Sequence, residues 1–160
     1  ARANKLLLKT FNLLPSDDVV EFEISVPSGS ESTSHIDLVS GLYLDDDNLY
    51  CVQADANTLL PFVRTVTGGG WPGSNFPGSA PTPPTRMRIK WRRYDGQNLV
   101  EYSYWNGTSW VVLANNTPSF APNSVIFGFQ LKTKHCYNIF FRQRVYRFCD
   151  WKVGRGTSFL

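Results

Sequence analysis

Residues 86–113, RMRIKWRRYDGQNLVEYSYWNGTSWVVL, decide the fold class of this chain. From Met87 to Arg92, apolar and basic residues alternate one by one, and a period of two is typical of a strand with one buried face. Asp95-Gly96 and Asn106-Gly107 then supply residue pairs that adopt positive φ in tight hairpin turns. The stretch therefore predicts three antiparallel strands joined by two tight turns.

The rest of the chain repeats this pattern of short strands and turns. Apolar residues alternate with polar ones from Val20 to Val26, and further strand-like segments lie at 36–44, 49–54, 59–66, 125–131, 136–141 and 145–153. Gly41 interrupts one of them, where we expect a bulge or bend. No stretch has the capped amphipathic pattern of a helix. The chain of 160 residues is therefore expected to form one all-β domain, an antiparallel β-sandwich of roughly ten strands spanning 1–160.

Residues 67–85, TGGGWPGSNFPGSAPTPPT, have the most unusual composition, because ten of these nineteen residues are Gly or Pro. The segments on both sides are incomplete sheets. We therefore expect a long surface loop rather than a linker between domains.

Several segments resemble the concanavalin A-like jelly-roll superfamily, which includes legume lectins, laminin G-like domains and glucanase-like modules. GLYLDDDNLY at 41–50 is similar to its hairpin with an acidic turn, and RIKWRRYDGQNLVEYSY at 88–104 to a second hairpin. VIFGF at 125–129 and FCDW at 148–151 resemble its last two strands. The resemblance spans about residues 16–154 and implies a jelly roll that binds carbohydrate.

The segment YWNGTSW at 104–110 resembles the W-N-G-x-x-W hairpins of bacteriophage tail and virion-surface proteins. Two Trp flank a four-residue turn, so their rings are expected to clasp across the strand pair. The resemblance implies a component of a virion.

Charge is unevenly distributed, although the net charge is only +3. Residues 1–60 hold ten acidic and three basic groups, whereas residues 61–160 hold thirteen basic and three acidic groups. Acidic and basic strands that neutralise each other within one sheet explain this most simply. The alternatives are a basic face for an anionic partner, or contacts between acidic and basic faces of neighbouring copies.

Three cysteines, Cys51, Cys136 and Cys149, lack the spacing of a zinc site. Cys136 and Cys149 are candidates for a bond across C-terminal strands in an oxidising compartment. Buried free thiols are the interpretation that we favour.

Catalytic patterns are weak, and we expect no enzyme. Glu21 and Glu23 resemble the paired acids of jelly-roll glucanases, but Val26 stands where a third acid is needed. His35 and His135 fit no nucleophilic triad. No cofactor is expected except Ca²⁺, for which the candidate ligands are Asp45, Asp46, Asp47 and Asn48. A solvated acidic turn is the simpler interpretation of these four residues.

Glycan binding has a better physical case, because rigid aromatic rings stack on the C–H faces of sugars. The candidate stacking residues are Trp71, Trp105, Trp110, Tyr102 and Tyr104. Arg86, Arg88, Lys90 and Arg92 form a basic surface stripe that suggests single-stranded nucleic acid as a third ligand class. We expect the rings to face away from this stripe, which disfavours nucleic acid.

The sequence thus favours a non-enzymatic β-sandwich domain at a virion surface or outside the cell. A phage tail fibre, receptor-binding or capsid-decoration protein is the expected type, with a glycan, a cell-surface receptor or neighbouring subunits as partner. A homo-oligomer is expected, and no apolar run is long enough to span a membrane. The alternative is a carbohydrate-binding module or lectin-like domain of a secreted bacterial enzyme.

Overall fold

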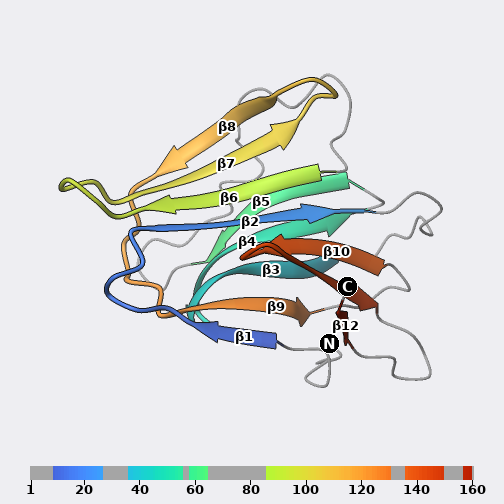
Figure 1. The fold of residues 1–160 in the computed structure, drawn as a ribbon, viewed down its shortest axis with the longest axis horizontal. Coiled ribbons are helices and arrows are strands. Elements are labelled where there is room, and N and C mark those ends of the chain that lie inside the picture. The colour runs from blue at the N-terminus through green and yellow to red at the C-terminus, as the bar shows by residue number, and fades with distance from the viewer. Residues whose placement is uncertain are drawn as a thin grey trace.

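In the part of the chain that the structure describes, twelve antiparallel strands form two stacked sheets (Figure 1). The computed structural model describes residues 9–26, 36–55, 58–64, 86–130, 136–149 and 157–159. The strands are β1 (Lys9–Asn12), β2 (Val19–Ser25), β3 (Ile36–Asp45), β4 (Asn48–Asp55), β5 (Thr58–Arg64), β6 (Arg86–Arg92), β7 (Leu99–Trp105), β8 (Trp110–Asn116), β9 (Ser124–Gln130), β10 (Cys136–Phe141), β11 (Arg144–Cys149) and β12 (Thr157–Phe159). One sheet has the order β1-β9-β3-β4-β5, and the other has the order β12-β11-β10-β2-β6-β7-β8.

This arrangement confirms the expected all-β antiparallel sandwich, and the described residues contain no helix. None of the described segments is a helix long and apolar enough to cross a membrane. The expected loop at 67–85, with Trp71, lies outside the described residues.

The meander β6–β7–β8 forms as the sequence predicts. Asp95 and Gly96 adopt φ values of 53° and 73° in the first turn, which Gln97 closes by donating its N–H to the Tyr94 carbonyl. In the second turn the Asn106 side-chain oxygen accepts hydrogen bonds from the backbone N–H groups of Thr108 and Ser109. Local turn chemistry therefore fixes the register next to each turn, and the β7–β8 pairing shifts by one residue between Tyr102 and Ser103.

The five-stranded sheet corrects the expectation for Gly41. The irregularity lies earlier, between Leu38 and Ser40, where β3 has an extra residue against β4. At the same place β9 has an extra residue against β3, because Leu38 pairs with Gln130 but Ser40 pairs with Phe127. Gly128, with φ 71°, occupies the extra position on β9, as a glycine bulge requires. Gly41 instead allows close approach of β4, because an added Cβ would lie 2.2 Å from the Tyr50 carbonyl oxygen.

The main core lies between the sheets and is rich in aromatic rings. Phe127 of β9 is central to it: its ring centroid lies between 5.4 and 6.0 Å from those of Phe11, Phe22, Phe141, Tyr146 and Phe148. From the seven-stranded sheet, Met87, Ile89 and Trp91 contribute buried side chains, as their alternation predicts. Tilted and edge-on ring contacts of this kind join the two sheets.

A second apolar cluster occupies the opposite face of the five-stranded sheet. It comprises Leu38, Leu49, Cys51, Phe62 and Ile126, each no more than 5% exposed. Both faces of this sheet are therefore buried. The outer face of the seven-stranded sheet, by contrast, has half-exposed side chains along β2 and β6.

The cysteines differ from our expectation of free thiols. Cys136 is disulfide-bonded and lies directly opposite Cys149 in the β10–β11 pairing. Cys51 alone matches the expectation, as a free and fully buried cysteine. A disulfide suits an oxidising compartment.

Candidate binding surface

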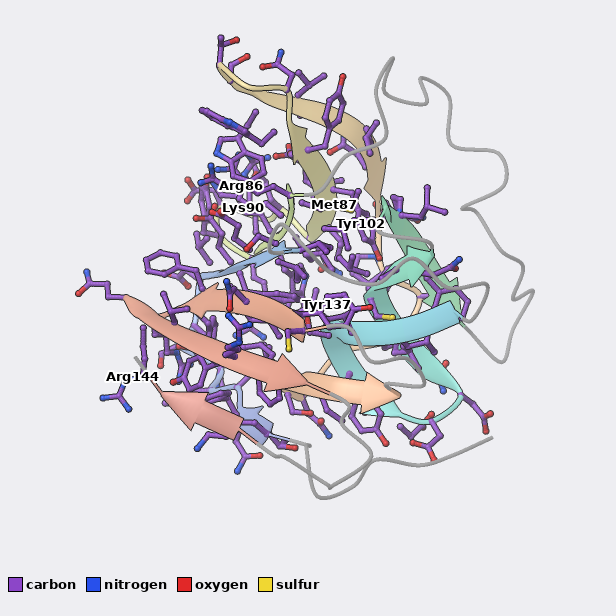
Figure 2. The ribbon with its side chains drawn as sticks, turned by 90° about the vertical axis from the view of Figure 1, so that its right-hand side faces the viewer. Arg86, Met87, Lys90, Tyr102, Tyr137 and Arg144 are labelled. Carbon is purple, nitrogen blue, oxygen red and sulfur yellow. The ribbon has the colours of Figure 1, made fainter. Side chains whose placement is uncertain are left out.

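The outer face of the seven-stranded sheet brings the acidic strand β2 against the basic strand β6. Glu21 pairs directly with Lys90 and Glu23 with Arg88, so their side chains share this face. Figure 2 shows Arg86 and Lys90 on one side of the sheet, whereas Met87 and Tyr102 point toward the other sheet. The period-two pattern of the sequence therefore separates the charged face from the core.

Ion pairs neutralise most of the basic stripe. Glu21 Oε2 lies 3.8 Å from Arg88 Nε and 3.7 Å from Lys90 Nζ, and Arg92 Nη1 donates a hydrogen bond of 3.2 Å to Glu101. Arg86 donates from Nε to Glu23. The acidic strand β2 and the basic strand β6 therefore compensate each other, as the simplest explanation of the uneven charge predicts for Glu21 and Glu23.

The two tryptophans of the β7–β8 hairpin clasp across the strand pair, as expected. Trp105 pairs directly with Trp110, and their ring centroids lie 5.5 Å apart at an interplanar angle of 64°. The Arg86 guanidinium lies 4.9 Å from the Trp105 ring centroid and 5.2 Å from that of Trp110. The Arg88 guanidinium lies 4.4 Å from the Trp110 ring centroid. These cation–π contacts hold both rings on the outer face.

This geometry corrects our expectation for Trp105 and Trp110, whereas Tyr102 and Tyr104 face away from the basic stripe as expected. Side chains alternate along β7, so Trp105 points to the face opposite that of Tyr102 and Tyr104. Trp105 and Trp110 therefore share the face of Arg86 and Arg88.

Tyr102 and Tyr104 leave the set of candidate stacking residues, because both are core residues. Tyr104 is 9% exposed and Tyr102 is fully buried. The Tyr102 hydroxyl lies 3.3 Å from the Cys51 carbonyl oxygen and 3.1 Å from the Phe62 carbonyl oxygen, both on the other sheet. Burial raises the pKa of the Tyr102 hydroxyl well above its usual value. No sugar reaches these rings in the folded state.

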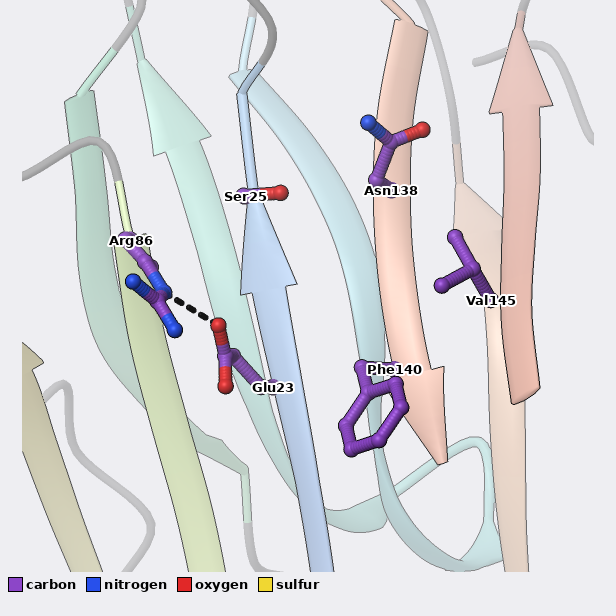
Figure 3. Close-up of a pocket in the computed structure, with 6 residues that line it drawn as sticks. All are labelled: Glu23, Ser25, Arg86, Asn138, Phe140 and Val145. Carbon is purple, nitrogen blue, oxygen red and sulfur yellow. Dashed lines mark hydrogen bonds and ion pairs between the residues drawn. The ribbon is translucent and has the colours of Figure 1, made fainter. Parts of the chain in front are cut away.

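A hollow of about 380 Å³ opens on the same outer face of the seven-stranded sheet (Figure 3). It lies over β2, β6, β10 and β11 and is lined by Glu23, Ser25, Arg86, Asn138, Phe140 and Val145. Phe140 is 47% exposed although the strands beside it pair on both edges. Arg86 joins the hollow to the tryptophans, since its guanidinium contacts both.

Sequence reasoning missed the β10–β11 half of this surface. Asn138 and Phe140 alternate with the buried Tyr137 and Ile139, which was the available signal for an outward-facing pair. The dense apolar run from Cys136 to Phe141 obscured that alternation.

Hydrogen bonds within the acidic turn between β3 and β4 hold its side chains in place. Asp45 Oδ1 accepts hydrogen bonds from the Asp47 N–H and the Asn48 side-chain amide, and Tyr43 donates a hydrogen bond of 2.6 Å to Asp46. Nowhere in the described ranges do three or more His, Cys, Asp or Glu side chains gather as a metal site requires. The calcium assignment to Asp45, Asp46, Asp47 and Asn48 therefore stays a prediction, and these hydrogen bonds agree with the simpler interpretation of a solvated turn.

Comparison with protein-family models, with curated proteins and with solved structures finds no match. The sandwich architecture is common to the jelly-roll resemblance and the structure, and the function is argued from the surface itself.

Proposed function

We propose that this chain is a non-enzymatic β-sandwich binding domain that attaches to glycans through the outer face of its seven-stranded sheet. A virion-surface protein such as a phage tail fibre, receptor-binding or capsid-decoration protein is the proposed setting. The W-N-G-x-x-W hairpin supports the virion, and the disulfide at Cys136 supports an extracellular location.

The observation that carries the proposal is the Trp105–Trp110 pair held by arginines on the half-exposed face of the sandwich. A sugar ring packs its C–H face on an aromatic ring, and its hydroxyls need charged or amide partners nearby. Both are present, because the rings adjoin Arg86 and the polar hollow. Rings already fixed by their neighbours lose little conformational entropy when a ligand binds.

The test is a glycan array probed with the purified domain and with Trp110→Ala. We expect the wild type to bind a defined set of glycans. Trp110→Ala should lower the affinity for these glycans by at least about tenfold, which corresponds to about 1.4 kcal/mol. Tyr94→Ala is the matched control, since Tyr94 is 39% exposed and lies in the turn at the other end of β7. Melting temperatures of both variants separate loss of binding from loss of folding. Unchanged glycan binding by a folded Trp110→Ala would contradict the proposal.

The alternative setting is a module of a secreted bacterial enzyme, which would use the same face. Oligomeric state distinguishes the two. A virion component assembles with copies of itself, whereas an appended module is expected to be a monomer in light-scattering measurements.

Single-stranded nucleic acid is the second candidate ligand, favoured by the finding that the tryptophans and arginines share one face. The ion pairs with Glu21, Glu23 and Glu101 oppose it. Binding of a labelled oligonucleotide that falls steeply with salt would support this candidate over the glycan. Weak binding with a flat salt dependence would exclude it.

A further inference from the structure

The hollow beside the tryptophan pair has features that the proposed stacking surface does not use. We propose that it is a subsite for an acidic sugar, one that carries a carboxylate or a sulfate. This inference rests on the proposed glycan function and adds the chemical class of the ligand. It places the stacked sugar on Trp105 and Trp110 and the acidic sugar in the hollow.

The lining of the hollow has the mixture of groups that a sugar needs. Phe140 and Val145 provide apolar surface on β10 and β11 for the C–H face of a pyranose ring. Ser25 and Asn138, which pair directly across β2 and β10, offer a hydroxyl and an amide for ring hydroxyls. The volume of about 380 Å³ lies within the range of small-molecule sites.

Asn138 adds an unsatisfied polar atom at this place. Its side-chain oxygen is buried and has no hydrogen-bond partner among the described residues. A buried acceptor without a partner is unfavourable in the free protein, so a hydroxyl donor from a ligand that reaches it gains affinity.

The charge of the surrounding strands favours an anion. Arg147 lies directly opposite Asn138 in the β10–β11 pairing, and its side chain therefore faces the same side of the sheet. Within the described part of the chain, its guanidinium forms no ion pair or hydrogen bond. Strand residues on the outer face thus present five basic groups (Arg86, Arg88, Lys90, Arg92 and Arg147) against three carboxylates (Glu21, Glu23 and Glu101).

Arg86 connects the two parts of the site. Its guanidinium lines the hollow and donates to Glu23 (Figure 3). The same guanidinium contacts both tryptophan rings. Two adjoining sugars of one chain would meet at Arg86, one stacked on the tryptophans and the other in the hollow. A guanidinium binds a carboxylate or a sulfate through paired N–H donors, which a lysine does not reproduce.

The experiment measures the affinity of the purified domain for matched glycan pairs that differ by one acidic group. Sialylated and desialylated forms of the same oligosaccharides test the carboxylate, and sulfated and unsulfated forms test the sulfate. We expect the acidic member of a pair to bind at least about tenfold more tightly, and Arg147→Gln to remove that preference while leaving the neutral member unchanged. Arg144→Gln, on the same strand and exposed, is the control that keeps the preference.

A second pair of variants distinguishes an effect of charge from an effect of misfolding. Val145→Glu adds a negative charge to the hollow, whereas Val145→Gln adds a group of the same shape without charge. We expect Val145→Glu to lower the affinity for the acidic glycan by at least about tenfold more than Val145→Gln does. Equal affinities for acidic and neutral glycans, or a preference that both Arg147→Gln and Val145→Glu retain, would overturn the subsite and leave the proposed function standing. Failure to bind any glycan would overturn the proposed function itself.

Discussion

Tyr102→Phe tests whether the Tyr102 hydroxyl stabilises the packing of the two sheets rather than binding a ligand. Its hydroxyl is fully buried and lies within hydrogen-bond distance of the Cys51 and Phe62 carbonyl oxygens. One hydroxyl donates a single proton, so the variant loses one net hydrogen bond, about 1 kcal/mol. For a chain of 160 residues this lowers the melting temperature by about 2–4 °C.

The assay is thermal unfolding followed by circular dichroism, beside glycan binding at 25 °C. Tyr94→Phe is the control, because removal of this exposed hydroxyl should change the free energy of unfolding by less than about 0.5 kcal/mol. Tyr102→Phe should be less stable and bind glycans as the wild type does. A Tyr102→Phe variant as stable as the wild type, or one that loses binding while remaining folded, would refute the inter-sheet role.

Two further outcomes follow from local features. Gln143→Gly should stabilise the fold by about 1 kcal/mol, measured by urea unfolding. Gln143 has φ 63° in the β10–β11 turn, a left-handed conformation that glycine adopts without strain, so a loss of stability would contradict this. Burial and the hydrogen bond to Asp46 raise the pKa of Tyr43 to about 12, so its phenolate should appear near pH 12 in the ultraviolet difference between wild type and Tyr43→Phe. The raised folded-state pKa contributes stability that is complete below pH about 10 and is lost as the pH rises through about 12. Asp46→Asn should move this titration toward pH 10 while Asp47→Asn leaves it in place, and equal titrations in the two variants would exclude the role of Asp46.

The sequence predicts the fold well where local chemistry decides it. Alternation from Met87 to Arg92 and the turns at Asp95 and Asn106 specify the meander, because strand period and turn type are local properties. The number of strands is less well predicted. β10 and β11 meet at Arg142 and Gln143, a turn without the usual glycine or asparagine, so no local signal marks it.

The candidate site was harder to predict, because it depends on the pairing of distant strands. The sequence identifies the tryptophans, but the predicted sheet face of Trp105 is wrong. The prediction groups Trp105 with Tyr102 and Tyr104, although side chains at positions 104 and 105 point to opposite faces. Arg147 and Asn138 join the surface only because β10 pairs with β2. That pairing brings together residues more than a hundred positions apart, which no short-range pattern encodes.

The most direct test of the central claim is a map of amide and indole chemical shifts when the domain binds a glycan selected on the array. Binding at the outer face of the seven-stranded sheet should move the indole N–H signals of Trp105 and Trp110 and the amides of β6, β7 and β10, and should leave that of the buried Trp91 nearly unchanged. Shifts confined to the β3–β4 turn or to other segments, with both of these indoles unmoved, would contradict it.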